Sequence, residues 1–390
     1  MPKNRLMGYT GREREFAAHF RGGVTEGIIP GTGVTVREEL FRSSGSYRYS
    51  DESKVSSVFR TLFRSGELEH ANGEFRYYIL TPGNTDGRGA IVLLHGLNER
   101  SWNKYLQWGT RLAADTGRPV VLFPSAYHMN RSPRSWIDRH LMMPLVAART
   151  SLLPDTRLST FVNVALSTRM SLSPQRFLLS GYQTLIDIAE LTGSIREGSH
   201  PALPGGGPVD IFAYSIGALA AQVMMLSRPS LLPDDTRVML FCGGSAFGLM
   251  NGTSKLIMDS RAFERLVSFY LSWPGRNGPP DDGRFMQIMN DTPEGEAFYG
   301  MTSLSRLKEV SGTPFKNSDG RFKAVTFAGD RVIPAKAVSA TLRGADVEIW
   351  QPEYPFTHEN PFPLLAGEQS QAVDSTFDRL FGMAAQFLAR

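Results

Sequence analysis

The stretch that decides the fold is VDIFAYSIGALAAQVMML, which runs from Val209 to Leu226. It begins with a short, largely apolar run that is typical of a buried strand, and it continues as an apolar, Ala-rich run that is typical of a buried helix. Between the two stands one small hydroxyl residue, Ser215, with Gly217 two positions later. The pattern predicts a strand, a sharp turn at Ser215 and a helix.

Similar short apolar runs, each followed by Gly, Pro or Ser, occur on both sides of this stretch. They are AIVLLHG (90–96), PVVLFPS (119–125), RVMLFCGGS (237–245), KAVTFAGD (323–330) and DVEIWQP (346–352). Strands that are apolar throughout indicate a parallel sheet covered on both faces. Segments 102–117 and 216–228 lie between such runs and have helical character. The alternation predicts an α/β protein with a mostly parallel, doubly wound sheet.

Two insertions interrupt the alternation, and both are far longer than the usual two to six residues of a connection. Because they follow the ends of strands, we expect them to form a helical cap over an apolar pocket at Ser215. The predicted organisation is an N-terminal extension packed on the core (1–74), an α/β core (75–125, 209–245 and 323–390) and cap insertions (126–208 and 246–322). Within the extension, the spacing of apolar residues in 53–68 predicts a short amphipathic helix.

The turn at Ser215 has the form of a nucleophile elbow, usually written G-x-S-x-G. Ala213 replaces the first glycine, and Gly217 remains. A serine hydroxyl is a weak nucleophile until a base takes its proton. The helix that begins behind it has unpaired backbone N–H groups, so the N–H of Ile216 would face an oxyanion formed at an attacked carbonyl. A second donor is expected from LLHGLNER (93–100), where the Leu97 N–H follows a His-Gly pair.

The base and its orienting acid are expected later in the chain, with the acid first. Asp330 follows an apolar run in VTFAGDRVIPAKAV, and His358 lies in YPFTHENPF after the final run. In this prediction His358 accepts the Ser215 proton, and Asp330 holds the imidazole in the correct tautomer.

These motifs, in this order and each after a strand, resemble those of the α/β-hydrolase superfamily over residues 75–390. The chain looks like a bacterial-type member with a large cap. The resemblance implies an α/β-hydrolase fold and a serine hydrolase that cleaves an ester, thioester or amide of a small-molecule acyl substrate through an acyl-enzyme, without a cofactor. The alternative is a catalytically silent protein of this fold that binds a ligand or partner under its cap.

Polar residues in SAYHMNRSPRSW (125–136) follow the apolar run at 119–125, near the expected mouth of the site. We predict that they contact a polar group of the substrate, with the arginines placed for an anionic end. They are His128, Asn130, Arg131 and Arg134. The alternative is ordinary hydrogen bonding within the loop.

Composition excludes several other classes of protein. The net charge of +4 comes from basic residues interspersed with acidic ones, so no nucleic-acid partner is expected. No metal motif is present, and the single Cys242 rules out an internal disulfide. Because we find neither a signal-peptide core nor a membrane span, we expect a cytoplasmic protein without stable membrane insertion. A homodimer is left open.

Overall fold

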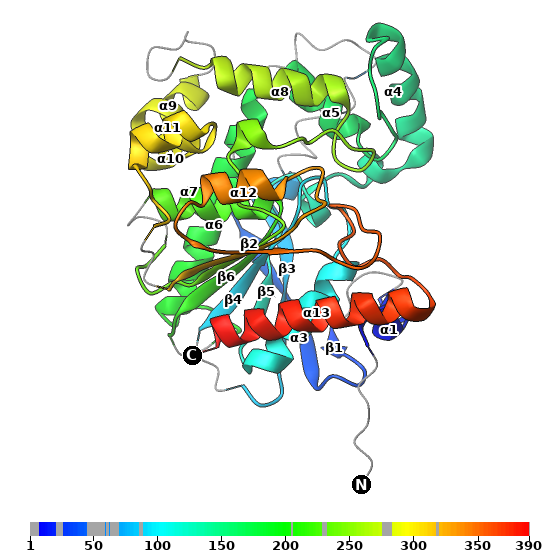
Figure 1. Cartoon of the computed structure of the whole chain (residues 1–390), viewed down its shortest axis with the longest axis vertical. Helices are drawn as coiled ribbons and strands as arrows, with labels where there is room; N and C mark the ends of the chain where they lie inside the picture. The colour runs from blue at the N-terminus through cyan, green and yellow to red at the C-terminus, as the bar shows by residue number, and fades with distance from the viewer. Residues whose placement is uncertain are drawn as a thin grey trace.

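The computed structural model describes residues 8–20, 26–44, 59, 62, 70–85, 89–203, 206–227, 232–274, 283–316 and 320–389. Within them, a nine-stranded sheet forms the centre of the molecule (Figure 1). Its strands are β1 (Gly27–Ile28), β2 (Val34–Arg42), β3 (Glu74–Pro82), β4 (Ala90–Leu94), β5 (Val120–Leu122), β6 (Val209–Tyr214), β7 (Val238–Phe241), β8 (Phe322–Phe327) and β9 (Asp346–Trp350). Their order in the sheet is β1-β2-β3-β5-β4-β6-β7-β8-β9.

The sheet is parallel from β5 to β9, while β1, β2 and β3 join it as antiparallel strands. Every residue of β4 and β6 is buried, as the apolar runs predict for strands covered on both faces. Successive side chains alternate between two cores: Ile211 and Ala213 of β6 contribute to one, and Phe212 and Tyr214 to the other.

Helices cover both faces of the sheet, as predicted for a doubly wound core. One face carries α1 (Tyr9–His19), α3 (Asn103–Thr116) and α13 (Gly367–Leu388), and the other carries α6 (Gln175–Arg196), α7 (Ile216–Leu226) and α12 (Ala335–Thr341). No helix among these described segments is both long and apolar enough to cross a membrane. This strand order, with helices on both faces and a strand–turn–helix at Ser215, is an α/β-hydrolase fold.

The insertions supply the helices above the carboxyl ends of the strands, at the top of Figure 1. They are α4 (Arg139–Leu152), α5 (Val164–Leu172), α8 (Ser260–Ser272), α9 (Gly283–Asp291), α10 (Pro293–Met301) and α11 (Leu304–Ser311). The two insertions are joined by a buried ion pair, in which Arg149 of α4 contacts both carboxylate oxygens of Asp259 at 2.5 and 2.9 Å. Asp259 also accepts the N–H of Ala262 as the N-cap of α8. A single carboxylate therefore orders a helix start and ties the insertions together.

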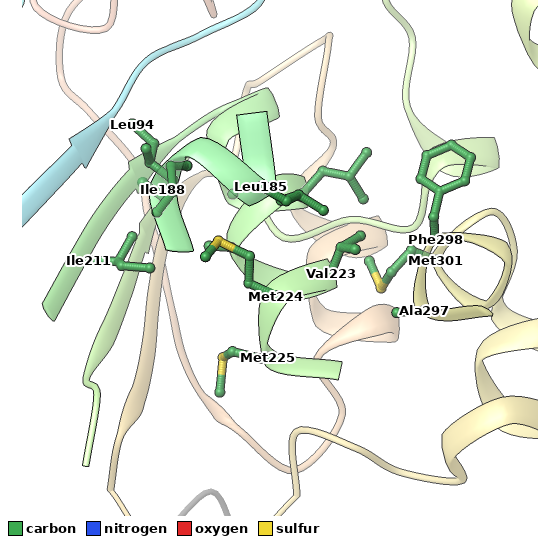
Figure 2. Packing of buried hydrophobic residues seen from close by; sticks show 14 of the residues in the cluster. Leu94, Leu185, Ile188, Ile211, Val223, Met224, Met225, Ala297, Phe298 and Met301 are labelled. Carbon is green, nitrogen blue, oxygen red and sulfur yellow. The ribbon is translucent and has the colours of Figure 1, made fainter. Parts of the chain in front are cut away.

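Helix α7 connects the sheet to the insertions. In Figure 2, Met224 lies near Ile188 of α6 and Ile211 of β6, whereas Val223 faces Phe298 of α10. All five side chains belong to one buried cluster. The helix that follows Ser215 is consequently held from both sides, which fixes the position of its first turn.

The structure places two segments differently from the sequence-based boundaries, and a third prediction falls largely on residues it does not describe. β1 and β2, within residues 1–74, extend the sheet itself. α6, within the predicted cap insertion 126–208, packs on the sheet face. The amphipathic helix predicted over 53–68 lies outside the described residues, apart from Phe59 and Leu62, which are buried.

Candidate active site

Ser215 occupies a strained turn between β6 and α7. Its backbone has φ 58° and ψ −120°, a conformation that costs on the order of 1–3 kcal/mol in a residue other than glycine. Close packing holds it there: a Cβ on Gly217 would lie 2.8 Å from the Leu94 Cβ and 2.9 Å from the Leu94 carbonyl oxygen. Only glycine fits at position 217. At position 213, where the motif usually has its first glycine, the methyl group of Ala213 is accommodated in the buried cluster on one face of the sheet.

Three side chains far apart in the sequence form one hydrogen-bonded chain. The Ser215 Oγ lies 2.6 Å from His358 Nε2, and His358 Nδ1 lies 2.7 Å from Asp330 Oδ2. Asp330 follows β8 and His358 follows β9, so the carboxyl ends of parallel strands bring them to one edge of the sheet. All three residues are at most 5% exposed.

The surroundings of Asp330 fix the direction of these hydrogen bonds. Its Oδ1 accepts the backbone N–H groups of Val332 and Ile333, both at 2.9 Å, and Oδ2 accepts from His358 Nδ1. With Nδ1 carrying the proton, Nε2 of His358 is left as an acceptor for the Ser215 hydroxyl. The arrangement has the geometry needed for a serine nucleophile with a histidine base.

Tyr214 and Lys104, which the sequence analysis did not single out, hold the loop that carries His358. The Tyr214 hydroxyl donates to the His358 carbonyl oxygen, and its ring stacks on the imidazole at a centroid distance of 5.6 Å. Lys104 Nζ donates to the carbonyl oxygen of the next residue, Glu359, at 2.9 Å, and lies 4.9 Å from the Tyr214 ring centroid. Two consecutive carbonyl groups of the histidine loop are thus bound by the elbow and by α3.

We expect Tyr214→Phe to lower kcat about tenfold with little change in KM, because it removes one hydrogen bond to the histidine loop and keeps the stacked ring. Steady-state kinetics on any confirmed substrate measures this. Tyr270→Phe is the matched control, since the Tyr270 hydroxyl also donates to a buried carbonyl, that of Pro174, at 2.9 Å but within the insertions. Equal losses in the two variants would mean that Tyr214 has no special role in positioning His358.

The two predicted oxyanion donors lie beside Ser215. Leu97 follows β4, Ile216 is the first residue of α7, and both line a cavity together with Ser215. Among the described residues, neither the Leu97 N–H nor the Ile216 N–H donates a hydrogen bond. Both donors are therefore available to an oxygen atom in that cavity.

The loop that carries Leu97 is anchored on both sides. The Gly96 N–H donates to the Tyr105 hydroxyl at 3.0 Å, and that hydroxyl donates to Glu99 at 2.9 Å. Asn98, at φ 61°, donates from its side-chain amide to carbonyl oxygens in both insertions, those of Val162 at 3.2 Å and Leu256 at 2.7 Å. Asn98 therefore connects the loop of the candidate oxyanion donor to both insertions.

His95 serves a structural purpose in the same loop. Its Nδ1 donates to the Gly96 carbonyl oxygen at 2.9 Å, and its Nε2 accepts the Ser125 N–H at 2.9 Å, which joins the ends of β4 and β5. Burial lowers the pKa of His95 to about 4, so the imidazole stays neutral.

This low pKa leads us to expect that acid destabilises the protein. Between pH 6.5 and about 4 the unfolded chain binds a proton at His95 and the folded chain does not, so the unfolding free energy falls by up to about 3 kcal/mol as the pH is lowered. Burial lowers the pKa of His128 as well, in the same direction. Denaturant unfolding at a series of pH values measures the slope, which should be shallower in His95→Asn. An unchanged slope in that variant would contradict this account.

The four predicted substrate contacts have different surroundings. Arg131 is fully buried and pairs with Asp187, its Nη2 lying 2.8 Å from Oδ2, so it belongs to the protein interior. Asn130 is exposed and donates to the Arg76 carbonyl oxygen, and Arg134 is exposed at the start of a 3-10 helix (Arg134–Ile137).

Of the four, His128 alone lines a cavity near Ser215. The predicted role of Arg131 at an anionic substrate end is wrong, because its charge is already matched inside the core.

Two apolar cavities adjoin the elbow. The larger has an empty volume of about 740 Å³ and the smaller about 390 Å³, counting the parts open to solvent. Leu97, Phe177 and Ile216 line both, so the cavities meet beside the candidate oxyanion donors. In the described residues, no group of three or more His, Cys, Asp or Glu side chains is placed to hold a metal ion.

Comparison with known proteins places the chain in a family. Solved structures similar to it include a bacterial heroin esterase (10% identity, 97% of this chain and 92% of that chain, TM-score 0.48). Others are carboxyl esterase 2 of the mycorrhizal fungus Tuber melanosporum (12%, 93% and 89%, 0.42) and a lipase in its open form (14%, 90% and 99%, 0.41). No curated protein matches. The model described as "Family of unknown function (DUF6051)" matches residues 9–389, and the chain belongs to that family.

Proposed function

We propose that the protein is a serine hydrolase that cleaves an ester, thioester or amide bond through an acyl-enzyme. The observation that carries the proposal is the chain of hydrogen bonds from Ser215 through His358 to Asp330, at 2.6 and 2.7 Å. A serine with a base in hydrogen-bond reach, and a base oriented by a carboxylate, is the arrangement that activates a hydroxyl for attack on a carbonyl.

In the first half of the proposed reaction, the Ser215 Oγ attacks the carbonyl carbon while His358 Nε2 takes the hydroxyl proton. The carbonyl oxygen becomes an oxyanion that accepts the N–H groups of Leu97 and Ile216, a contact worth about 3–4 kcal/mol of transition-state stabilisation per donor in comparable sites. The tetrahedral intermediate then breaks the bond to the leaving group, which receives the proton from His358. Ser215 is left as an ester of the acyl group.

In the second half, water attacks the acyl carbon and gives its proton to His358. A second tetrahedral intermediate forms against the same donors and collapses to the free acid, and the proton returns to Ser215. Asp330 stays ionised throughout and stabilises the imidazolium that forms in each half.

The bond type is tested with one acyl group presented in three ways: p-nitrophenyl butyrate, a butyryl thioester and butyryl anilide. We expect purified protein to turn over at least one of them, and the order of the three kcat/KM values identifies the bond. If none is cleaved although the protein is folded, the alternative function, ligand binding by a catalytically silent protein of this fold, is favoured instead.

A further inference from the structure

The larger cavity follows one face of α7 away from Ser215. Ile216, Gly217, Ala220 and Val223 line it, and residues at this spacing share one face over two helical turns. With a rise of 1.5 Å per residue, the lined length of helix is roughly 10 Å. The cavity therefore extends along α7 from the candidate oxyanion donors.

The walls of this cavity suit hydrocarbon. Leu185 of α6 and Phe298 of α10 stand opposite Val223, and the three side chains face one another in Figure 2. The polar His128 on the wall is held neutral by burial, which lowers its pKa, and its Nδ1 donates to the Ala126 carbonyl oxygen at 2.8 Å. An apolar chain gains about 25 cal/mol for each Å² that leaves water in such a place.

The described lining of both cavities offers no cation to an anionic acyl end. Neither cavity is lined by an arginine or a lysine among the described residues. The larger cavity instead contains one acidic side chain, that of Glu294. A substrate carboxylate in this apolar space would lose its hydration and meet no cation on the lining.

The smaller cavity lies on the side where a leaving group must depart. Val332 and Ile333, whose N–H groups bind Asp330, line it together with Ser215. Because the imidazole has to deliver its proton to the leaving group, that group must lie on the side of the acid and histidine loops. Phe263 of α8 also lines this mostly apolar cavity.

We infer that the substrate is an uncharged ester of a medium-length fatty acyl group and a smaller apolar alcohol. The acyl chain occupies the larger cavity along α7, and the alcohol occupies the smaller cavity beside the acid loop. The inference rests on the proposed function and adds the substrate class and the direction in which the substrate lies.

The first experiment compares kcat/KM of the wild type for p-nitrophenyl acetate, butyrate, octanoate and the anionic hemisuccinate. Octanoate should exceed acetate by about tenfold or more, because added methylene groups are buried. Hemisuccinate should fall about tenfold or more below butyrate. An enzyme that prefers acetate, or that accepts hemisuccinate as well as butyrate, would overturn the inference.

The second experiment fills the larger cavity in one variant and enlarges the smaller cavity in another. Ala220→Leu should lower the ratio of octanoate to acetate kcat/KM about tenfold, whereas the same substitution at Ala114, exposed on α3, should leave the ratio unchanged. Phe263→Ala should alter the preference among octanoate esters of different alcohols and keep the acyl-chain ratio. If Ala220→Leu does not fold, Val223→Phe fills the same cavity.

The outcomes separate the two levels of the proposal. In one outcome, ester hydrolysis requires Ser215, but Ala220→Leu and Val223→Phe leave the ratio of octanoate to acetate kcat/KM unchanged. This result refutes the assignment of the acyl chain to the larger cavity and is still consistent with a serine hydrolase. Absence of hydrolysis of every ester, together with an unreactive Ser215, refutes both.

Discussion

Ser215→Ala is expected to reduce kcat by a factor on the order of 10⁴ to 10⁶, to the residual rate that binding and the oxyanion donors alone provide. The alanine has no hydroxyl to form the acyl-enzyme, so only direct attack of water on the bound substrate remains. The fold should survive, because the methyl group fits where the serine side chain was and the backbone strain is the same. Initial rates of ester hydrolysis and the thermal unfolding midpoint measure the two parts of this expectation.

Ser151→Ala is the matched control, because Ser151 is exposed at the end of α4. It should keep the activity of the wild type. Turnover of Ser215→Ala within tenfold of the wild type would mean that another group is the nucleophile.

Asp330→Asn should lower kcat by about 10² to 10⁴-fold, through the tautomer of His358. The N–H groups of Val332 and Ile333 donate to Oδ1 at 2.9 Å, so the asparagine must keep its carbonyl oxygen there. Its NH₂ group then faces Nδ1 of His358, which becomes an acceptor. The proton moves to Nε2, the nitrogen that has to accept the proton of Ser215.

Steady-state kinetics on a substrate that the wild type cleaves measures the loss. The same change at Asp378, exposed on α13, serves as the control. A loss below about threefold would show that His358 is oriented by a different group.

The strands that the sequence predicts most clearly are those in which every residue is buried. β4 and β6 read as continuous apolar runs because helices cover both of their faces. β2, with the sequence VTVREELFR, carries three charged residues between its ends and is partly exposed. A strand towards the edge of a sheet faces water along much of its length, so its sequence resembles a polar extension.

Helix α6 illustrates a second limit. Its apolar residues have helical spacing, which the sequence shows, but the same spacing serves a helix on a sheet and a helix in a cap. The two positions are distinguished only by tertiary packing, in which Leu185 and Ile188 join the buried cluster that includes residues of β4 and β6.

The candidate triad is visible in the sequence because each member lies at, or in the loop after, the end of a strand, and parallel strands end at one edge. The role of Arg131 was not visible, since its partner Asp187 comes 56 positions later and from the helix α6, whose place the sequence did not give. The position of Tyr214, directly before Ser215, was the one sign in the sequence that this residue lies at the site. Its hydrogen bond to the His358 carbonyl, however, depends on how the last loop folds.

The central claim, that Ser215 is an activated nucleophile, is tested most directly by a fluorophosphonate probe followed by intact-mass and peptide mass spectrometry. The account predicts one adduct per chain, located on Ser215, that is lost in Ser215→Ala and slowed in Asp330→Asn. A folded protein that gains no adduct, or that carries it on another residue, would contradict the account.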